Sequence, residues 1–581
     1  MTGSEKKYHF IGAAEVIVAL ILALIFTLGR SVYKFCSLYA LWAEPKESVA
    51  VFFFFFIPML LVCAFLGLGI RKCGKNTHTY SKKTKVILAV TAGVLVMASC
   101  VLALLAYFPG ILAYDSLTAT LQACDVFPVS SGRSVIHTLL WNLFLAFEWM
   151  GLPHPVGLVL YVVLQILCVS ALCGYVVLTE LEEGCNIFFC ILTMLYYALY
   201  PAFSVMSTEM TSEFLFSCVL ILIFIRLSGA GKCEKDRPVL FGILYVLACL
   251  LNTDFLIAAV ILFFILLINV KKEGFKKLVL ASLSGLVISI LVLCVIYPAC
   301  GVKSRDEKDR LSVPVQQVAS VYLVRYQELT IAEKFLIESY MQAGYYNPRH
   351  AEPVLNSFDN ELYVSDRSAF WDLYLHLFNK YPEDFLNAFL TLNVQSWYPG
   401  ADMTDPYSQA FYVDTMNDSC EYYPISRIPA VPGLTIIYEF IFGSIESYGP
   451  VKGMIFSLSI PFIALMLGIY IAVRTHRRGY AAAVIMALAL WLTLLFGPLT
   501  AFVTLYPFFM LIPLFFMPVF ATVPVITTAP DQDETDSSSE TKSADDEDGK
   551  EKEDKEVKEG KEAREDKEVK PDPEEPECPD D

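Results

Sequence analysis

The residues best suited to chemistry follow the third apolar stretch of the chain, where Pro109-Gly110 predicts a turn. Asp115 lies five residues beyond this turn, where the apolar stretch should meet the membrane surface. A carboxylate at that boundary can act as a general base on a hydroxyl group held at the interface. The same pattern also suits an aspartate that caps the next helix at Ser116. The spacing alone leaves both interpretations open.

Further polar residues follow in the same segment: Gln122, then Arg133 and His137. The planar guanidinium of Arg133 matches the oxygens of a phosphate group, although it could equally anchor the chain at the membrane interface. His137 begins an apolar helix that contains Trp141, where a hydrogen-bonded interfacial histidine is the alternative to a ligand.

A second acidic group, Glu209 and Glu213, lies between the fifth and sixth apolar stretches. Residues four apart share one side of a helix, so these carboxylates could face Asp115. One Asp and two Glu suit a hard divalent cation such as Mg²⁺ or Ca²⁺, and ordinary helix capping is the alternative. Metal dependence stays open, and the sequence identifies no other cofactor.

The composition is that of a polytopic membrane protein. Of 581 residues, 56% are apolar and 18% are charged, whereas soluble chains carry about 25% charged residues. A soluble fold of this composition would expose large apolar patches. The net charge of −17 resides mainly in the tail from residue 527, which has 24 acidic and 9 basic residues. Nothing in the charge pattern indicates nucleic-acid binding.

About 20 mostly apolar residues are needed to cross a membrane as a helix. On that basis we predict twelve helices in an all-α membrane protein, near 11–29, 49–70, 86–108, 155–178, 186–203, 212–229, 239–252, 255–270, 278–299, 452–473, 479–498 and 501–525. The pair at 239–270 is short enough to be a hairpin. With twelve crossings, the loops rich in Lys and Arg all fall on one face, which predicts cytoplasmic N- and C-termini.

Four regions follow from these segments. Residues 1–300 form a transmembrane module whose first external loop is 109–153, and residues 301–450 form an extracytoplasmic domain. Residues 451–526 form the last transmembrane helices, and 527–581 a disordered, acidic cytoplasmic tail. Helical periodicity at 332–343 and 367–392 predicts a mainly helical external domain.

The Tyr-Phe-Pro-Gly and Tyr-Asp-Ser motifs of 107–116 resemble a family of polytopic bacterial membrane proteins of unassigned activity that is allied to the GT-C glycosyltransferases. His137-Thr-Leu-Leu and the Ser-Val-Pro-Val-Gln-Gln run at 312–317 resemble the same family, as does Trp397-Tyr-Pro. These islands lie within residues 100–520.

The resemblance implies a GT-C-like fold and a sugar donor linked to polyprenyl phosphate. It implies that Asp115 is the general base, and that the acceptor is a cell-envelope glycan or lipid. It adds Gln316, Gln317 and Trp397 to the substrate-binding candidates Gln122, Arg133, His137, Glu209 and Glu213. Two alternatives stay open: a transporter or flippase of a lipid-linked glycan in the cell membrane, and a non-catalytic envelope scaffold.

Overall fold

The computed structural model describes residues 12–72, 78–112, 115–230, 237–272, 274–401, 423, 428–447, 455–497 and 502–521, except for the side chains of 115, 442–447, 502 and 503. All of them belong to the first of two units, Met1–Val525 and Ile526–Asp581. The disorder predicted for the tail from residue 527 therefore concerns residues outside the described part of the chain. In this part of the chain every regular element is a helix, and β-pairing is limited to isolated bridges.

Five of the described helices are long and apolar enough to cross a membrane: Ala13–Phe35, Pro45–Lys72, Lys82–Ala106, Val156–Glu182 and Phe275–Ala299. The first four are α1, α2, α3 and α6, and the fifth comprises α12 (Phe275–Leu291), a π turn and α13 (Tyr297–Ala299). Shorter apolar helices are also present: α5 (Val135–Trp149), α7 (Ile187–Leu199), α9 (Ser212–Ser228), α10 (Pro238–Leu251), α11 (Phe255–Ile268), α20 (Pro432–Ser447), α22 (Ile460–Thr475), α23 (Arg478–Leu494) and α24 (Phe502–Phe520). The chain is thus a multi-pass membrane protein, while the count of twelve spans and the GT-C architecture stay predictions.

The short hairpin at 239–270 is present as predicted. α10 ends at Leu251 and α11 begins at Phe255, and the side chain of Asn252 accepts a hydrogen bond from the Asp254 amide across the turn. Each helix has 14 residues, or about 21 Å of helix, against about 30 Å of hydrocarbon.

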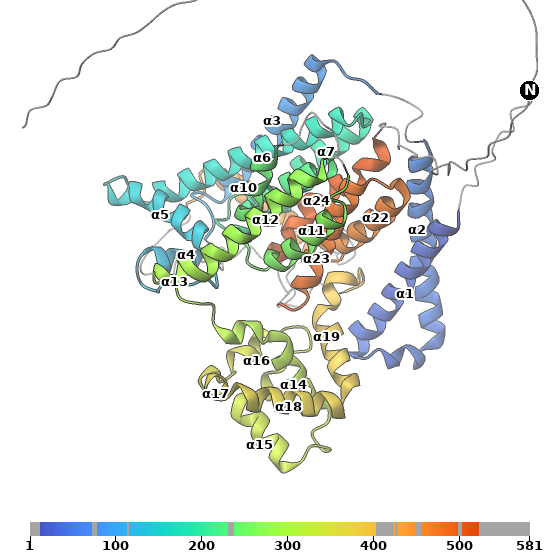
Figure 1. Cartoon of the computed structure of the whole chain (residues 1–581), viewed down its shortest axis with the longest axis vertical. Coiled ribbons are helices and arrows are strands. Elements are labelled where there is room, and N and C mark those ends of the chain that lie inside the picture. Colours follow the sequence, from blue (N-terminus) through green and yellow to red (C-terminus); the bar gives the residue numbers. More distant parts are fainter. Residues whose placement is uncertain are drawn as a thin grey trace, which may run out of the picture. The chain divides into compact units, whose positions relative to one another are not determined.

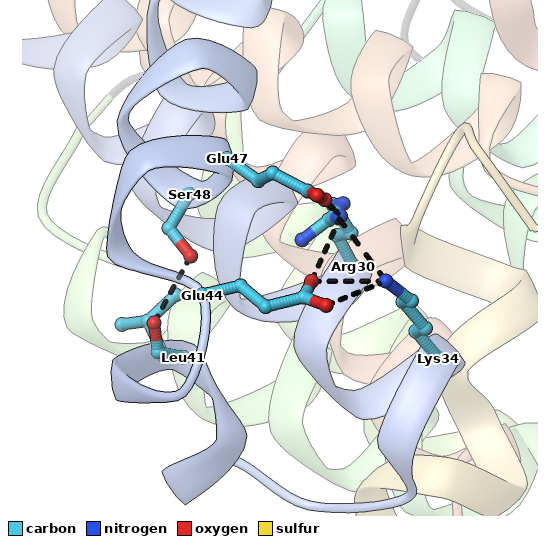
Figure 2. Close-up of polar contacts among 6 residues, drawn as sticks. All are labelled: Arg30, Lys34, Leu41, Glu44, Glu47 and Ser48. Atoms are coloured by element: carbon cyan, nitrogen blue, oxygen red, sulfur yellow. Dashed lines mark hydrogen bonds and ion pairs between the residues drawn. The ribbon is translucent and has the colours of Figure 1, made fainter.

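Polar contacts sort the helix ends into two groups. In one group, Glu15 of α1 pairs with Arg71 of α2 and Arg474 of α22. In the other, Arg30 and Lys34 at the far end of α1 pair with Glu44 before α2 (Figure 2). The N-terminal end of α1 thus lies beside the C-terminal ends of α2 and α22. Which group faces the cytoplasm stays a prediction.

Six helices between 312 and 397 pack around their own apolar core, which includes Val315, Val318, Ile337, Phe370 and Leu377 (Figure 1). They are α14 (Ser312–Val324), α15 (Ile331–Tyr340), α16 (Glu352–Asn356), α17 (Asn360–Ser365), α18 (Arg367–Lys380) and α19 (Pro382–Trp397). We call them the α14–α19 domain. Further along, α20 (Pro432–Ser447) packs along α3.

Two predicted helix boundaries in this domain need correction. The helix expected over 367–392 is two helices, because Pro382 cannot continue α18 and instead begins α19, which runs on to Trp397. The helix expected over 332–343 ends at Tyr340, where Met341 adopts an extended backbone conformation.

The α14–α19 domain contacts the end of α1 that carries Arg30. Arg349 stacks on the ring of Tyr33, with its guanidinium 4.0 Å from the ring centroid, and it donates to the Tyr33 carbonyl at 3.2 Å. The amide of Leu38 donates to the Asn387 side chain at 3.0 Å. These contacts position the domain on the same group of helix ends as Glu44.

Candidate functional site

The loop that leads to Asp115 is joined by backbone hydrogen bonds to the turn before α9. The Ile111 amide donates to the Thr208 carbonyl at 2.9 Å, and the Met210 amide donates to the Ile111 carbonyl at 3.1 Å. Gly110 has a φ of 141°, and a Cβ there would lie 3.3 Å from the Thr208 carbonyl oxygen. Glycine is therefore required for this close approach.

The side chain of Gln165 in α6 also holds this turn by hydrogen bonds. Its side-chain amide donates to the carbonyl of Glu209 at 2.7 Å and to that of Ser207 at 3.1 Å. All three residues are buried. The backbone that carries Glu209 is thus held by contacts from two separate segments, the 107–112 loop and α6.

Asp115 is the first residue of α4 (Asp115–Ala123). Its side chain lies outside the described part of the structure. The neighbouring Ser116 and Thr120 are fully buried, and the Thr120 hydroxyl donates to the Ser116 carbonyl at 2.8 Å. The helix predicted after Asp115 is therefore present, while the general-base role of its carboxylate stays a prediction.

Gln122 links α4 to α5 (Val135–Trp149). Its side chain contacts the hydroxyls of Ser130 and Thr138, each at 3.4 Å, and it is buried. These contacts give Gln122 a packing role between the two helices. A substrate contact for it stays a prediction.

His137 and Arg133 differ in exposure. His137 is buried, and its Nε2 atom lies 2.9 Å from the Tyr161 hydroxyl of α6. Arg133 is exposed, just before Ser134 caps α5. Of the two, only Arg133 presents its charge at the surface.

The two glutamates also differ. Glu209 is buried in the turn described above, whereas Glu213 lies half-buried in the first turn of α9. The carboxylate of Glu213 accepts a hydrogen bond from the Ser212 hydroxyl at 3.1 Å.

The chain entering the α14–α19 domain lies against the segment between α4 and α5. The Lys303 amide donates to the Val129 carbonyl at 2.9 Å, and the Ser131 amide donates to the Lys303 carbonyl at 2.8 Å. Arg305 pairs with Asp254 at the tip of the α10–α11 hairpin, 3.7 Å away. The 303–305 segment thus contacts both the 129–131 segment and this hairpin.

Gln316, Gln317 and Trp397 lie elsewhere. The side chain of Gln316 donates to the Asn347 carbonyl and that of Gln317 to the Phe385 carbonyl, within the α14–α19 domain. Trp397 lines an apolar cavity of about 390 Å³ between α1, α19, α22 and α23. None of the three has a described contact with the 107–138 segment.

Sequence reasoning missed a second polar group, at the far end of α5. The Glu148 carboxylate lies 2.5 Å from Nδ1 of His154 and accepts a hydrogen bond from Tyr423 at 2.9 Å. A carboxylate that orients a histidine is an arrangement suited to proton transfer. The six-residue spacing of Glu148 and His154 gives little signal by itself, and Tyr423 is 275 residues distant from Glu148 in sequence.

Another missed residue is Glu180 of α6, which is fully buried and accepts a hydrogen bond from Thr193 of α7 at 2.8 Å. An ionisable residue within a membrane helix is a functional candidate on energetic grounds. Its position at the end of a long apolar segment concealed it, since a terminal glutamate in such a segment is usually solvated.

Among the described residues, no three His, Cys, Asp or Glu side chains are grouped so as to hold a metal ion. The side chain of Asp115 is outside that search, so metal dependence stays open. No protein family, curated protein or solved structure matches the chain.

Proposed function

We propose that this protein is a GT-C-like membrane glycosyltransferase that transfers a sugar from a polyprenyl-phosphate donor to a cell-envelope glycan or lipid. One observation carries the proposal. The backbone hydrogen bonds between Ile111 and the 208–210 turn bring the loop that leads to Asp115 beside Glu209. The segment that leads to the candidate base is thus joined to the turn that carries a second carboxylate from a distant part of the sequence.

In the proposed reaction, Asp115 accepts the proton of the acceptor hydroxyl. The acceptor oxygen forms a bond to the anomeric carbon of the donor sugar. The bond between that carbon and the phosphate oxygen breaks, and polyprenyl phosphate leaves with the electron pair. General-base catalysis of this kind typically contributes 10²- to 10⁴-fold in rate.

The surrounding residues have separate roles in this scheme. Arg133, which is exposed, pairs with the donor phosphate. Glu213, which is half-buried in the first turn of α9, orients the acceptor hydroxyl. The buried Glu209 and His137 support the site from within, because their surroundings leave little room for a substrate contact. The α14–α19 domain, which begins against the 129–131 segment, covers the acceptor and excludes water.

The experiment is complementation of a deletion strain, with mass spectrometry of its envelope glycans and lipid-linked sugars. We expect the deletion to remove a sugar from a glycan, the wild-type chain to restore it, and Asp115→Asn to fail at normal membrane abundance. Asp125→Asn is the matched control: Asp125 lies on the same loop with a φ of 57°, a conformation that asparagine adopts readily.

Two results would overturn the proposal. Restoration of the sugar by Asp115→Asn would remove the general base and favour a scaffold. Accumulation of a complete lipid-linked glycan in the deletion strain, with no sugar missing, would favour the flippase.

A further inference from the structure

A groove runs along the outer surface of the helix bundle between α10 and α12, which lie side by side (Figure 1). Its volume is about 580 Å³. The walls are almost entirely apolar, and the residues at its rim are open to the surroundings: Val239 is 74% exposed and Leu280 is 69% exposed. The groove lies remote in sequence from the Asp115 loop, and none of the polar candidates described above lines it.

Small residues let the two helices that form the groove pack closely against each other. A Cβ on Gly242 would lie 3.4 Å from the Ala281 carbonyl oxygen, and one on Gly285 would lie 2.9 Å from the ring of Tyr245. These contacts also set the register: Gly242 lies opposite Ala281, and Tyr245 opposite Gly285. The two helices therefore run in the same direction, with both N-termini at one end of the groove.

The length of the groove matches one leaflet of a bilayer. Its wall on α12 extends from Lys277 to Ile288, which corresponds to about 16 Å of helix. Half of the hydrocarbon core of a bilayer is about 15 Å. One hydrocarbon chain of a lipid in that leaflet would fill the groove from the headgroup region to the bilayer centre.

The end of the groove at the two N-termini is strongly basic. Lys277 lines the groove itself, and Pro238 at the start of α10 lies at the same end. Four further cations flank these helix starts, Arg237, Lys271, Lys272 and Lys276, and they outnumber the two acidic residues interleaved with them, Asp236 and Glu273. Within the described ranges none of these five cations forms an ion pair. The first turns of both helices add unpaired backbone N–H groups and a positive dipole end.

We propose that this groove binds an anionic glycerophospholipid of the leaflet that surrounds the N-termini of α10 and α12. One acyl chain lies between the helices, and the phosphate lies beside Lys277 and the two helix starts. The apolar walls exclude a sugar or a peptide because they offer no hydrogen-bond partners, and the Ser284 hydroxyl is already engaged with the Ala281 carbonyl. The charge at the mouth selects an anionic headgroup over a zwitterionic one.

The experiment is native mass spectrometry of the full chain in a neutral detergent, titrated with phosphatidylglycerol and with phosphatidylcholine of identical acyl chains. We expect phosphatidylglycerol to bind on the order of tenfold more tightly. Lys276→Gln/Lys277→Gln should remove that preference. Ser284→Phe, which places a ring in the groove from an exposed position, should weaken the binding of both lipids.

The matched control is Lys82→Gln/Lys83→Gln, which removes the same charge from exposed positions at the start of α3. It should leave the preference intact. Equal affinity for the two lipids, an equal loss of preference in the control pair, or unchanged binding in Ser284→Phe would each overturn the proposal. Its outcome is independent of sugar transfer, because the readout is lipid bound to the purified chain.

Discussion

The two ends of the α1–α2 pair carry similar ionic groups in different surroundings. At one end, Glu15 is fully buried and accepts hydrogen bonds from Gly12 and Tyr470, at 2.9 and 3.0 Å, with Arg71 3.3 Å away. At the other end, Glu44 retains 30% of its side-chain exposure among Arg30 and Lys34 (Figure 2).

The difference lies in what else is present at each end. Around Glu15, α22 closes over the α1–α2 pair and supplies both Tyr470 and Arg474. Around Glu44, the neighbouring Glu47 keeps 58% of its side-chain exposure, and the ion pairs described for the group join only α1 to Glu44 and Glu47. Ion pairs therefore join three helices at one end, whereas at the other end they connect α1 only to the start of α2.

The largest effect is expected from Glu15→Ala. This substitution removes the carboxylate that Arg71 and Arg474 share. Because a buried charge is then left without its partner, the free energy of unfolding should fall by about 2 to 4 kcal/mol. The measurement is the thermal unfolding midpoint of the detergent-purified chain. A midpoint equal to that of Glu44→Gln would contradict the distinction between the two ends.

A smaller loss of stability is expected from Gly29→Ala, at the residue before Arg30. A Cβ there would lie 2.8 Å from the side chains of both Trp397 and Tyr398, so α1 and α19 must separate. Such overpacking costs about 1 to 3 kcal/mol. Gly344→Ala is the control, because nothing lies within 4 Å of its Cβ position. The readout is faster proteolysis of the α14–α19 domain; equal rates in both variants would show that the α1–α19 contact is not tight.

Much of this architecture could be predicted from the sequence. Apolar runs of membrane length gave the helices, because a lipid-exposed backbone must satisfy its hydrogen bonds within each helix. Pro109-Gly110 gave the turn before α4. The helix break at Pro382 could also be predicted, since proline cannot continue α18. Helical periodicity on both sides of Pro382 instead suggested one continuous helix.

Long-range pairings could not be predicted. In the sequence, Glu15 only interrupts an apolar run. Its partners Arg71 and Arg474 lie 56 and 459 residues away, and no local pattern predicts either pairing. The burial of His137 and Gln122 likewise depends on Tyr161 and Ser130, so a pattern of polar residues could not separate surface candidates from packed ones.

In the α14–α19 domain we expect a loss of folding stability at acid pH, of intermediate size. Burial would raise the pKa of Glu333, but hydrogen bonds from Lys380, the Thr330 backbone and His376 outweigh it and lower the pKa to about 2. A depressed pKa stabilises the folded domain above the ordinary pKa of the carboxyl group. That contribution is lost as the pH falls from about 4.5 toward 2.

The measurement for Glu333 is amide hydrogen exchange of residues 312–397 between pH 6 and pH 3, corrected for the intrinsic pH dependence of exchange. Protection should fall over this interval in the wild-type chain and change less in Glu333→Gln, which starts from lower protection. A parallel fall in both chains would assign the acid sensitivity to other groups.

The smallest effect is expected from Glu44→Gln. Hydrogen bonding from Lys34 lowers the pKa of Glu44, with Arg30 acting in the same direction, so the carboxylate is charged at neutral pH and its contribution is lost on acidification. Arg30 keeps Glu47 as a partner after the change. Exposed pairs gain little because water and salt screen them. The unfolding midpoint should therefore stay close to that of the wild-type chain, and 1 M salt should remove any residual difference. A salt-resistant loss approaching that of Glu15→Ala would mean that this cluster, through the neighbouring Tyr33–Arg349 contact, helps to hold the α14–α19 domain against α1.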